Sequence, residues 1–339
     1  MDKKRIGVVI VSYGNTSDVA SLVKSFQKQL AKTDKLIVVD NKKPWKLKKY
    51  LNSKKVKTIV ENHDNGGFGE GCNFGASKII NDVDILLFIN PDMVLKQDDF
   101  VKKMRCGYEK FDVWGGLIVN TEDGKLQLRE VPQHISGLSW SGGFGEDPKK
   151  ITADYNASGV SGGCLAIKTE LFHRLGGFIS EYFMYFEDRD LCTRALLSGA
   201  KIGYLHDARI LHNYEYQKSS YKWKYLERNR LMSMLITWPT LLLVLTFIPN
   251  LLMNALIFMQ YLISGKPHLK IWADFNFLKE IPFCLQERTV IKKSIKITRR
   301  EFFDSLSYKI DTKQLGVIGN NNIINALFHV YYRFLRLFM

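Results

Sequence analysis

The chain has 339 residues, of which 46% are hydrophobic and 12% aromatic, a composition that excludes a globally disordered protein. Its net charge of +15 indicates an acidic partner, such as nucleic acid, an anionic membrane surface or a phosphorylated substrate. The five cysteines are scattered, with no CxxC pair and no metal-site spacing, which indicates buried thiols in a reducing compartment.

Strands and helices alternate over the first hundred residues. Runs rich in Val and Ile predict buried strands over residues 5–13, 36–40 and 56–60, and a fourth apolar run ends at Asn90. Apolar residues recur at helical spacing over residues 19–30. This alternation predicts a mostly parallel α/β sheet. The short apolar run near the N-terminus fits a strand better than a signal peptide, so the N-terminal part is expected in the cytoplasm.

A second set of elements follows residues 123–154, a variable stretch expected to form active-site loops. The motif VSGGCLAIKTELFHRLGGF predicts a strand and a helix that ends at Gly176 and Gly177. The motif EYFMYFEDRDLCTRALLSGAKIGYL predicts another helix and strand. A further short strand, ARILHNY, is expected to end at His212.

Polar residues stand at the ends of apolar strands in four places: Ser12–Asn15, Asp40–Asn41, Asn90–Asp92 and His212. Pro91 cannot donate to a sheet ladder, so the strand before it must finish there. Strand ends on one edge of a parallel sheet converge, so these distant positions can build a single pocket. Taken alone, the motif NPD is equally consistent with a turn and a helix cap.

The glycine-rich loop DNGGFGEGCNFG, residues 64–75, lies between the third predicted strand and a helix. Its glycines lack the spacing of a dinucleotide fingerprint and do not follow the first strand, which argues against a hydride-transfer domain. They allow close backbone approach at a helix start, where N–H groups favour an anion such as a diphosphate. A turn with only a packing role is the alternative.

The motif YFEDRDLCTR places three acidic residues within four positions. Asp190 and Arg194 are four residues apart and are expected to form a structural ion pair on a helix. Glu187 and Asp188 begin that helix, where acids often only complement the helix dipole. The aromatic residues before them favour a partly apolar cleft, the setting of a tuned general base.

His212 and Asp92 are candidate metal ligands. An isolated histidine is more often a satisfied core residue, but this one stands at a strand end together with Asp92 and an asparagine. Oxygen ligands with one imidazole suit Mn²⁺ or Mg²⁺ better than structural zinc.

Taken together, seven motifs resemble the family-2 glycosyltransferases with a GT-A fold, particularly their bacterial rhamnosyltransferase-like branch. In chain order they are VVIVSYGN, IVVDN, ENHDNGGFGEGCNFG, LLFINPD, VSGGCLAIKTELFHRLGGF, FMYFEDRDLCTR and ARILHN. They lie within about residues 5–215. The resemblance implies a GT-A catalytic domain over residues 1–215. The remaining residues, 216–339, are expected to form a helical, basic, membrane-associating region because of their apolar run and basic charge.

The resemblance also implies roles for individual residues. Asp92, in the family's variant of the DxD motif, and His212 should hold Mn²⁺ or Mg²⁺ on the sugar-nucleotide diphosphate. Asp188 matches the catalytic base, with Glu187 as the alternative. The positions expected to bind the nucleotide sugar are Tyr13, Asn15, Asp40, Asn65, Gly67, Asn73 and Asn90.

The implied reaction is inverting transfer of a sugar, best matched by L-rhamnose from dTDP-rhamnose, to a hydroxyl of a lipid-linked saccharide in bacterial cell-surface polysaccharide synthesis. A UDP-hexose or UDP-galactofuranose donor is the alternative within the fold. Two departures bear on specificity. Ile179 and Ser180 replace the acidic pair of the family's GGFDE motif, and the basic stretch KKPWKLKK follows Asn41.

An uncharged run covers residues 231–265, and 13 Lys/Arg stand against 6 Asp/Glu from Ser264 onward. The run exceeds the roughly 20 apolar residues of a spanning helix, but Pro239 and Pro249 interrupt it. Basic flanks on both sides predict a re-entrant hairpin or in-plane helices on the cytoplasmic face of the membrane. Anionic lipid would account for the surplus charge. The alternative is a buried helical core.

Two other classes of protein fit parts of the sequence. A nucleic-acid-binding protein would explain the charge, but the chain contains no recognised nucleic-acid module, so no nucleic-acid partner is expected. A catalytically inactive scaffolding or binding protein at the membrane is possible in this fold, since fold alone does not imply function. Retention of Asp92, Glu187, Asp188 and His212 together argues against it.

Overall fold

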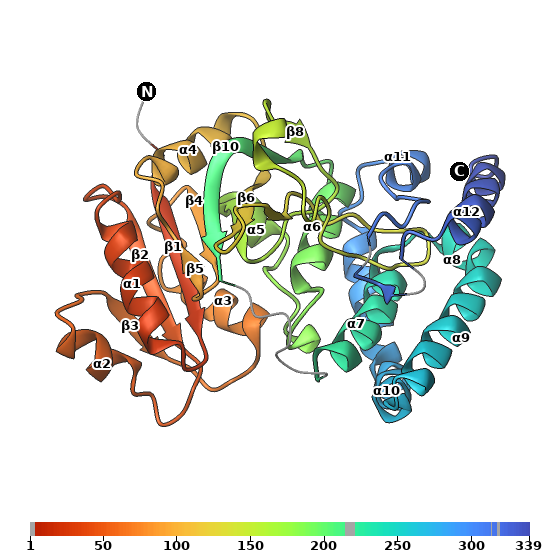
Figure 1. Cartoon of the computed structure of the whole chain (residues 1–339), viewed down its shortest axis with the longest axis horizontal. Coiled ribbons are helices and arrows are strands. Elements are labelled where there is room, and N and C mark those ends of the chain that lie inside the picture. Colours follow the sequence, from red (N-terminus) through yellow and green to blue (C-terminus); the bar gives the residue numbers. More distant parts are fainter. Residues whose placement is uncertain (1–3, 214–220, 313, 317–318) are drawn as a thin grey trace. The chain divides into compact units, whose positions relative to one another are not determined.

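The computed structural model describes residues 4–213, 221–312, 314–316 and 319–339 (Figure 1). The chain forms two compact units, which we name the α/β unit and the helical unit. The α/β unit comprises Met1–Glu130, Gly143–Ala195 and Ala200–Tyr216, and the helical unit comprises Val131–Gly142, Leu196–Gly199 and Gln217–Met339. The expected boundary between residues 215 and 216 lies outside the described residues.

The α/β unit is built on one mixed sheet, which has ten strands among the residues that the structure describes. These strands are β1 (Ile6–Ser12), β2 (Lys35–Asp40), β3 (Ile59–Asn62), β4 (Ile85–Ile89), β5 (Met93–Val94), β6 (Val113–Asn120), β7 (Leu126–Leu128), β8 (Tyr155–Asn156), β9 (Cys164–Lys168) and β10 (Ile202–His212). The main order is β3-β2-β1-β4-β9-β6-β10-β5, with β7 beside β6 and β8 beside β10.

Parallel pairing places the carboxyl ends of several strands at one edge of this sheet. β1 lies between β2 and β4, parallel to both, with Ser12 opposite Asp40. β9 runs antiparallel between β4 and β6, so its first residue, Cys164, lies opposite Ile89 at the end of β4. β10 is parallel to β6. The prediction that the polar strand ends lie along a common edge is therefore confirmed.

The helices of this unit are α1 (Thr16–Gln27), α2 (Leu47–Ser53), α3 (Phe68–Ser77), α4 (Phe100–Cys106), α5 (Thr169–Arg174) and α6 (Glu187–Leu197). α1 buries four of the apolar residues that predict it, at the spacing of one helix face: Val19, Leu22, Val23 and Phe26. The last two residues of α6, Leu196 and Leu197, belong to the helical unit.

Two glycines let α3 lie against the sheet. A Cβ atom on Gly75 would be 2.7 Å from Cγ1 of Val9, and one on Gly71 would be 2.8 Å from Cγ1 of Val11. Any larger residue at either position would push the helix off strand β1. Part of the glycine-rich sequence therefore serves packing, which was one of its two interpretations.

The structure differs from the sequence-based prediction at two strands. The two short strands expected around residues 200–214 form one strand, β10, because both segments pair with β6. A register shift between Leu205 and Arg209 accommodates the residues between them. The third strand begins at Ile59, later than the expected start at residue 56.

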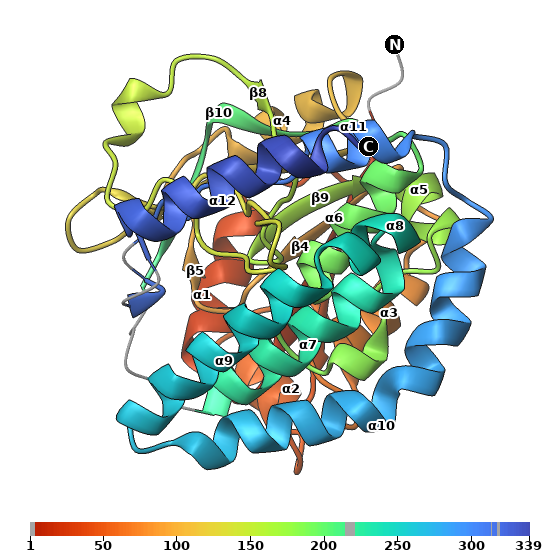
Figure 2. The same cartoon turned by 90° about the vertical axis from the view of Figure 1, so that its right-hand side faces the viewer.

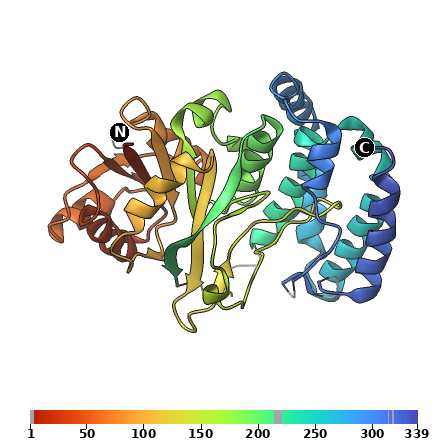
Figure 3. The ribbon, with the colours of Figure 1, turned by 90° about the horizontal axis from the view of Figure 1, so that it is seen from above.

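In the described part of the helical unit, the helices gather into a bundle (Figures 2 and 3). They are α7 (Tyr221–Thr237), α8 (Thr240–Leu245), α9 (Phe247–Ile263), α10 (Pro267–Lys292), α11 (Arg299–Asp304) and α12 (Asn322–Leu335). Pro239 stands at the N-cap of α8 and so divides the uncharged run of residues 231–265. Within the described residues, no helix has both the length and the apolar character that crossing a membrane requires.

The uncharged run has two different environments. In its first part Met232, Trp238 and Leu242 are at most 1% exposed and belong to the core of the helical unit. In its second part, α9, only Met253 and Ile257 are buried. The run is therefore neither a single apolar helix nor a wholly buried core.

Candidate active site

The predicted metal ligands Asp92 and His212 lie together. β5 pairs antiparallel with the end of β10, with His212 opposite Met93. This pairing brings the NPD turn to the histidine, and Nε2 of His212 lies 3.2 Å from Oδ1 of Asp92. His212 is buried, with 6% of its surface exposed. The two-residue strand β5 thus places the NPD turn beside the end of β10, where Asp92 and His212 form a polar pair.

Gln127 on β7 orients the ring of His212. Its Oε1 lies 2.7 Å from Nδ1 of His212, and because an amide oxygen can only accept, Nδ1 carries the proton. In the neutral ring, Nε2 then presents a lone pair towards the carboxylate of Asp92. A carboxylate oxygen and an imidazole nitrogen at this separation are both atoms that bind divalent cations. No sequence signal marked Gln127, which lies in a stretch expected to form loops.

The predicted acidic pair begins helix α6. Oδ2 of Asp188 accepts a hydrogen bond of 2.7 Å from the backbone N–H of Gly162, and Oδ1 accepts one of 2.7 Å from Arg189. Glu187 is 6% exposed, and its Oε2 is buried without a hydrogen-bond partner in the described part of the chain. The two acids therefore differ: Asp188 is held in a fixed orientation, whereas Glu187 is enclosed.

Burial acts on the pKa of both acids. It raises the pKa of Glu187 well above its usual range, and the adjacent Asp188 raises that pKa further. Burial also raises the pKa of Asp188, although the N–H groups of Gly162 and Arg189 oppose the shift. Of the two acids, Glu187 therefore holds its proton more strongly, and Asp188 ionises first. The expected ion pair of Asp190 and Arg194 is confirmed, at 2.6 Å.

The segment before α6 holds a strained backbone. Phe183, Tyr185 and Phe186 have φ values of 62°, 65° and 74°, which aromatic residues rarely adopt. Gly67 packs against this segment, because a Cβ atom there would lie 1.8 Å from the carbonyl oxygen of Phe183. The backbone N–H of Phe68 also donates to that oxygen, at 2.8 Å. The glycine-rich loop thus supports the aromatic segment that leads into the two acids.

A loop that the sequence did not single out for the site connects its two halves. The backbone N–H of Asn90 donates to the carbonyl of Gly163 at 3.1 Å, next to the NPD turn. The neighbouring Gly162 donates to Asp188. A side chain at position 162 would crowd Phe68, 3.0 Å away, and Asp188. Through these two hydrogen bonds, Gly162 and Gly163 connect the NPD turn, which carries Asp92, to Asp188.

The basic insertion after Asp40 is anchored at the same edge. The carboxylate of Asp40 accepts hydrogen bonds from the backbone N–H groups of Lys42 and Leu47, at 3.2 and 3.1 Å. The Nζ atom of Lys42 lies 5.5 Å from the ring centre of Tyr13, which is 58% exposed. Asn15 is the N-cap of α1 and makes no side-chain capping bond. Tyr13, Asn15 and Lys42 thus stand together where β1 and β2 end.

Two of the expected nucleotide-sugar ligands are engaged in the fold. Oδ1 of Asn65 accepts from the N–H of Gly67 at 3.3 Å. Asn73 donates to the carbonyl of Phe178 at 2.7 Å and accepts from its N–H at 2.8 Å. Both side-chain amides therefore hold backbone segments of the site in place. Their contact with a sugar-nucleotide donor stays a prediction. Ile179, which replaces an acid of the family motif, is largely buried.

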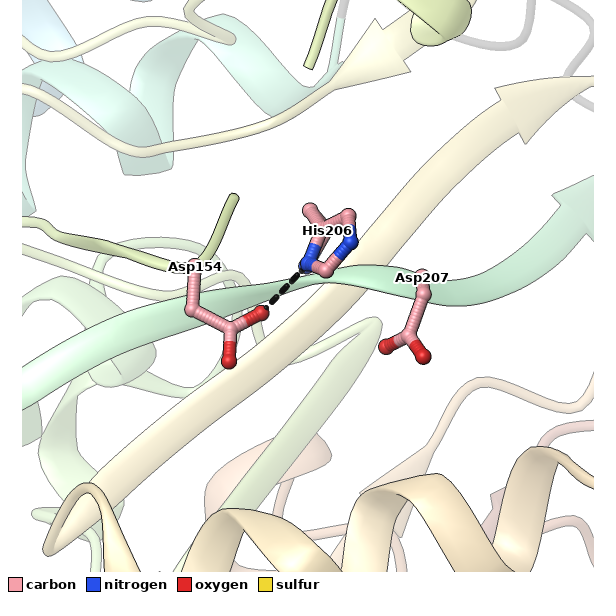
Figure 4. A group of neighbouring side chains, drawn as sticks. All are labelled: Asp154, His206 and Asp207. Carbon is pink, nitrogen blue, oxygen red and sulfur yellow. Dashed lines mark hydrogen bonds and ion pairs between the residues drawn. The ribbon is translucent and has the colours of Figure 1, made fainter. Parts of the chain in front are cut away.

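A second group of potential ligands, Asp154, His206 and Asp207, lies at the irregular part of β10 (Figure 4). Nδ1 of His206 lies 2.7 Å from Oδ1 of Asp154. Lysines engage both carboxylates: Lys110 lies 2.5 Å from Asp154, and Lys103 lies 3.6 Å from Asp207. Ion pairs already neutralise this group, which is therefore a weaker metal candidate than Asp92 and His212.

Comparisons with known proteins identify relatives of this chain. The chain is 26% identical over 251 residues to Rhamnosyltransferase WbbL of Escherichia coli (strain K12), an alignment that covers 67% of this chain and 94% of that protein. It is 41% identical over 54 residues to N-acetylglucosaminyl-diphospho-decaprenol L-rhamnosyltransferase of Mycobacterium tuberculosis, which covers 16% of this chain and 18% of that one.

The fold is also similar to that of a solved structure, GalNAc-T7 with UDP, GalNAc and Mn²⁺. The TM-score is 0.56 at 16% identity, over 84% of this chain and 58% of that one, and this likeness shows a GT-A-like fold. Residues 147–218 match the family described as N-terminal domain of galactosyltransferase. Residues 7–176, half of the chain, match the family described as Glycosyl transferase family 2. The protein therefore belongs to glycosyl transferase family 2.

Proposed function

We propose that this glycosyltransferase moves a sugar from a nucleoside diphosphate to an acceptor hydroxyl with inversion at the anomeric carbon. The observation that carries the proposal is the loop of Gly162 and Gly163. One of its glycines binds the NPD turn beside the Asp92–His212 pair, and the other binds the carboxylate of Asp188. The Gly162–Gly163 loop would then hold the diphosphate site and the general base in fixed positions relative to each other.

Asp188 would act as the general base. Its two hydrogen bonds from backbone N–H groups fix the direction in which the carboxylate points. Its raised pKa makes it a stronger base than an exposed aspartate. The neighbouring Glu187 has its pKa raised more strongly, so a second negative charge beside this base is disfavoured. Asp188 would thus take the proton of the acceptor hydroxyl as its oxygen attacks the anomeric carbon.

Asp92 and His212 would hold Mn²⁺ or Mg²⁺. Oδ1 of Asp92 and Nε2 of His212 lie 3.2 Å apart, and the bond to Gln127 fixes the orientation of the histidine ring. When bound, the ion would neutralise charge on the nucleoside diphosphate. The chain's own part is to position these ligands on the short β5–β10 pairing and to keep the histidine ring in one tautomer.

For the donor and the acceptor we propose dTDP-L-rhamnose and a lipid-linked saccharide of bacterial cell-surface polysaccharide synthesis. The names of the relatives support this choice, since both are rhamnosyltransferases and the mycobacterial name specifies a diphospho-decaprenol acceptor. The low identity to WbbL leaves a UDP-hexose or UDP-galactofuranose as the alternative donor.

Thermal stabilisation by a panel of dTDP-, UDP- and GDP-sugars, with and without Mn²⁺ or Mg²⁺, tests the proposal. A ligand that binds only the folded state raises the melting temperature, so dTDP-rhamnose with metal should give the largest shift. The Asp92→Ala variant should lose the metal-dependent part of that shift. If no sugar nucleotide stabilises the protein, the inactive scaffolding alternative replaces the enzyme.

A further inference from the structure

Helix α9 exposes one entire side made of large apolar residues. These residues are between 48% and 83% exposed, and they are Phe247, Ile248, Leu251, Leu252, Leu256, Met259, Leu262 and Ile263. The helix contains no charged residue. A soluble protein seldom leaves so large a continuous apolar surface in water unless something binds it.

The opposite side of α9 is already occupied. Met253 and Ile257 are 1% and 5% exposed and pack in a core cluster with Leu138, Trp140 and Ile310. Phe328 of α12 packs against the same cluster. Because this side is used by the helical unit itself, α9 cannot be surrounded by lipid on all sides. Helix α9 therefore lies along the surface of the helical unit, with one side buried and the other exposed.

Helix α12 carries a second apolar stripe. Ile323, Leu327, Val330 and Phe334 recur at intervals of three or four residues and are between 48% and 74% exposed. Leu337 and Phe338, which follow the end of the helix, are 80% and 48% exposed. The stripe is flanked by the exposed residues Arg333 and Arg336. Such a pattern of apolar residues beside arginines is typical of a helix at a membrane interface.

The two stripes lie on the same side of the helical unit. α12 packs near α8 and α9, since the hydroxyl of Tyr331 donates to the carbonyl of Leu245 and Phe328 contacts the core cluster. Figure 2 shows both helices in the foreground, and Figure 1 shows both at the same edge of the unit. Together they form one surface, which we name the α9–α12 face.

Charge favours a bilayer over a second copy of the chain as the occupant of this face. The helical unit has 18 Lys/Arg and 7 Asp/Glu, all of them within Gln217–Met339. Two copies with this excess would repel each other, whereas a surface of anionic lipids attracts each basic residue. Burial of the apolar side chains and attraction of the basic residues to anionic lipid would then both favour membrane binding.

We propose that the α9–α12 face inserts into the headgroup boundary of an anionic bilayer, with both helices parallel to the membrane plane. At 17 residues, α9 would lie along roughly 25 Å of that boundary. The proposal goes beyond the proposed transfer reaction and does not depend on it, because lipid binding is measured without donor or acceptor. It assigns the anchoring to α9 and α12 and leaves the start of the uncharged run in the core.

Flotation of the full chain with vesicles tests the proposal. The wild-type protein should float with vesicles of phosphatidylglycerol and phosphatidylcholine, bind more weakly to phosphatidylcholine alone, and remain partly bound in high salt, since salt screens charge but not apolar burial. The pair Leu252→Glu and Leu256→Glu should lower the partition coefficient by about 100-fold, because two apolar side chains are lost. The pair Leu327→Glu and Val330→Glu in α12 should do the same.

A matched control is Ile59→Glu, which changes an apolar residue that is 48% exposed on strand β3 of the α/β unit. It should bind vesicles as the wild type does. Unchanged melting temperatures show that the exposed substitutions leave the fold intact. Failure of the wild type to float, its complete release by salt, or equal loss in the control would overturn the proposal. A solution dimer that both Glu pairs dissociate would instead make the face an interface between copies.

Discussion

Two places on strand β10 gather the same kinds of side chain but differ in how those side chains are bonded. At the end of the strand, Nε2 of His212 faces Asp92, while Gln127 holds the other ring nitrogen. In the irregular middle of the strand, His206 and two aspartates form the larger group, but Lys103 and Lys110 neutralise the carboxylates. The chemistry available to a cluster therefore depends on the partners of its ligand atoms more than on its residue types.

The largest expected effect is that of Asp188→Asn. The change keeps the shape of the side chain and removes its basicity, so transfer should fall by about 10²–10⁴-fold while the affinity for donor is nearly retained. Steady-state kinetics and donor titration measure the two quantities. The same substitution at Asp207, in the middle of β10, removes only a surface ion pair with Lys103 and should change turnover little.

Near-normal turnover of Asp188→Asn would move the role of base to Glu187. The substitution also has a separate effect on stability. Asparagine has only one acceptor oxygen, so it can bond to only one of the backbone N–H groups of Gly162 and Arg189. Loss of the other hydrogen bond should lower the free energy of unfolding by about 1–3 kcal/mol. Chemical denaturation of the variant separates this cost from the loss of catalysis.

The second prediction contrasts the two histidines directly. His212→Ala and Asp92→Ala should each remove most of the Mn²⁺-dependent binding of nucleotide, because both side chains would supply ligands to one ion. His206→Ala should leave that binding unchanged, since Asp154 keeps its ion pair with Lys110. Calorimetry with and without EDTA measures the difference. If EDTA does not affect transfer by the wild type, Asp92 is only a turn residue.

A smaller effect is expected for Gln127→Leu, which removes the acceptor of the Nδ1 proton of His212. The ring can then change tautomer or rotate, and affinity for Mn²⁺ should fall by about 10–100-fold. Gln127→Glu keeps an acceptor oxygen and should restore most of the affinity. Equal affinity of the Leu variant and the wild type would show that Gln127 only packs against the histidine.

Much of the α/β unit could be predicted because its signals are local. Each apolar run and the polar residues after it specify a strand and its end, so Asp92 and His212 could be placed at strand ends from the sequence. Gln127 and Gly162 were not identified, because their roles come from pairings between segments distant in sequence. The structural use of Asn73 was missed for the same reason, since its partner Phe178 lies 105 residues away.

The helical unit offers a contrasting case. The uncharged run of residues 231–265 indicated an apolar segment but could not separate its buried start from the exposed side of α9. Composition records how apolar a segment is, whereas packing decides which of its residues meet water. Met232 and Ile263 belong to the same run, yet their exposed fractions are 0% and 83%.

The last prediction concerns stability and separates the two acids of α6. Burial raises the pKa of Glu187 above its value in the unfolded chain, so the folded state binds more protons between the two pKa values. The free energy of unfolding must then fall as pH rises above the usual glutamate pKa, by at most about 1.4 kcal/mol per pH unit. Glu187→Gln imitates the protonated form and should remove this dependence, so its advantage over the wild type should grow from acidic to neutral pH. Chemical denaturation at several pH values measures it. Parallel curves for the two proteins would mean that Glu187 is ionised in the folded state, and the charge assigned to Asp188 would then be shared.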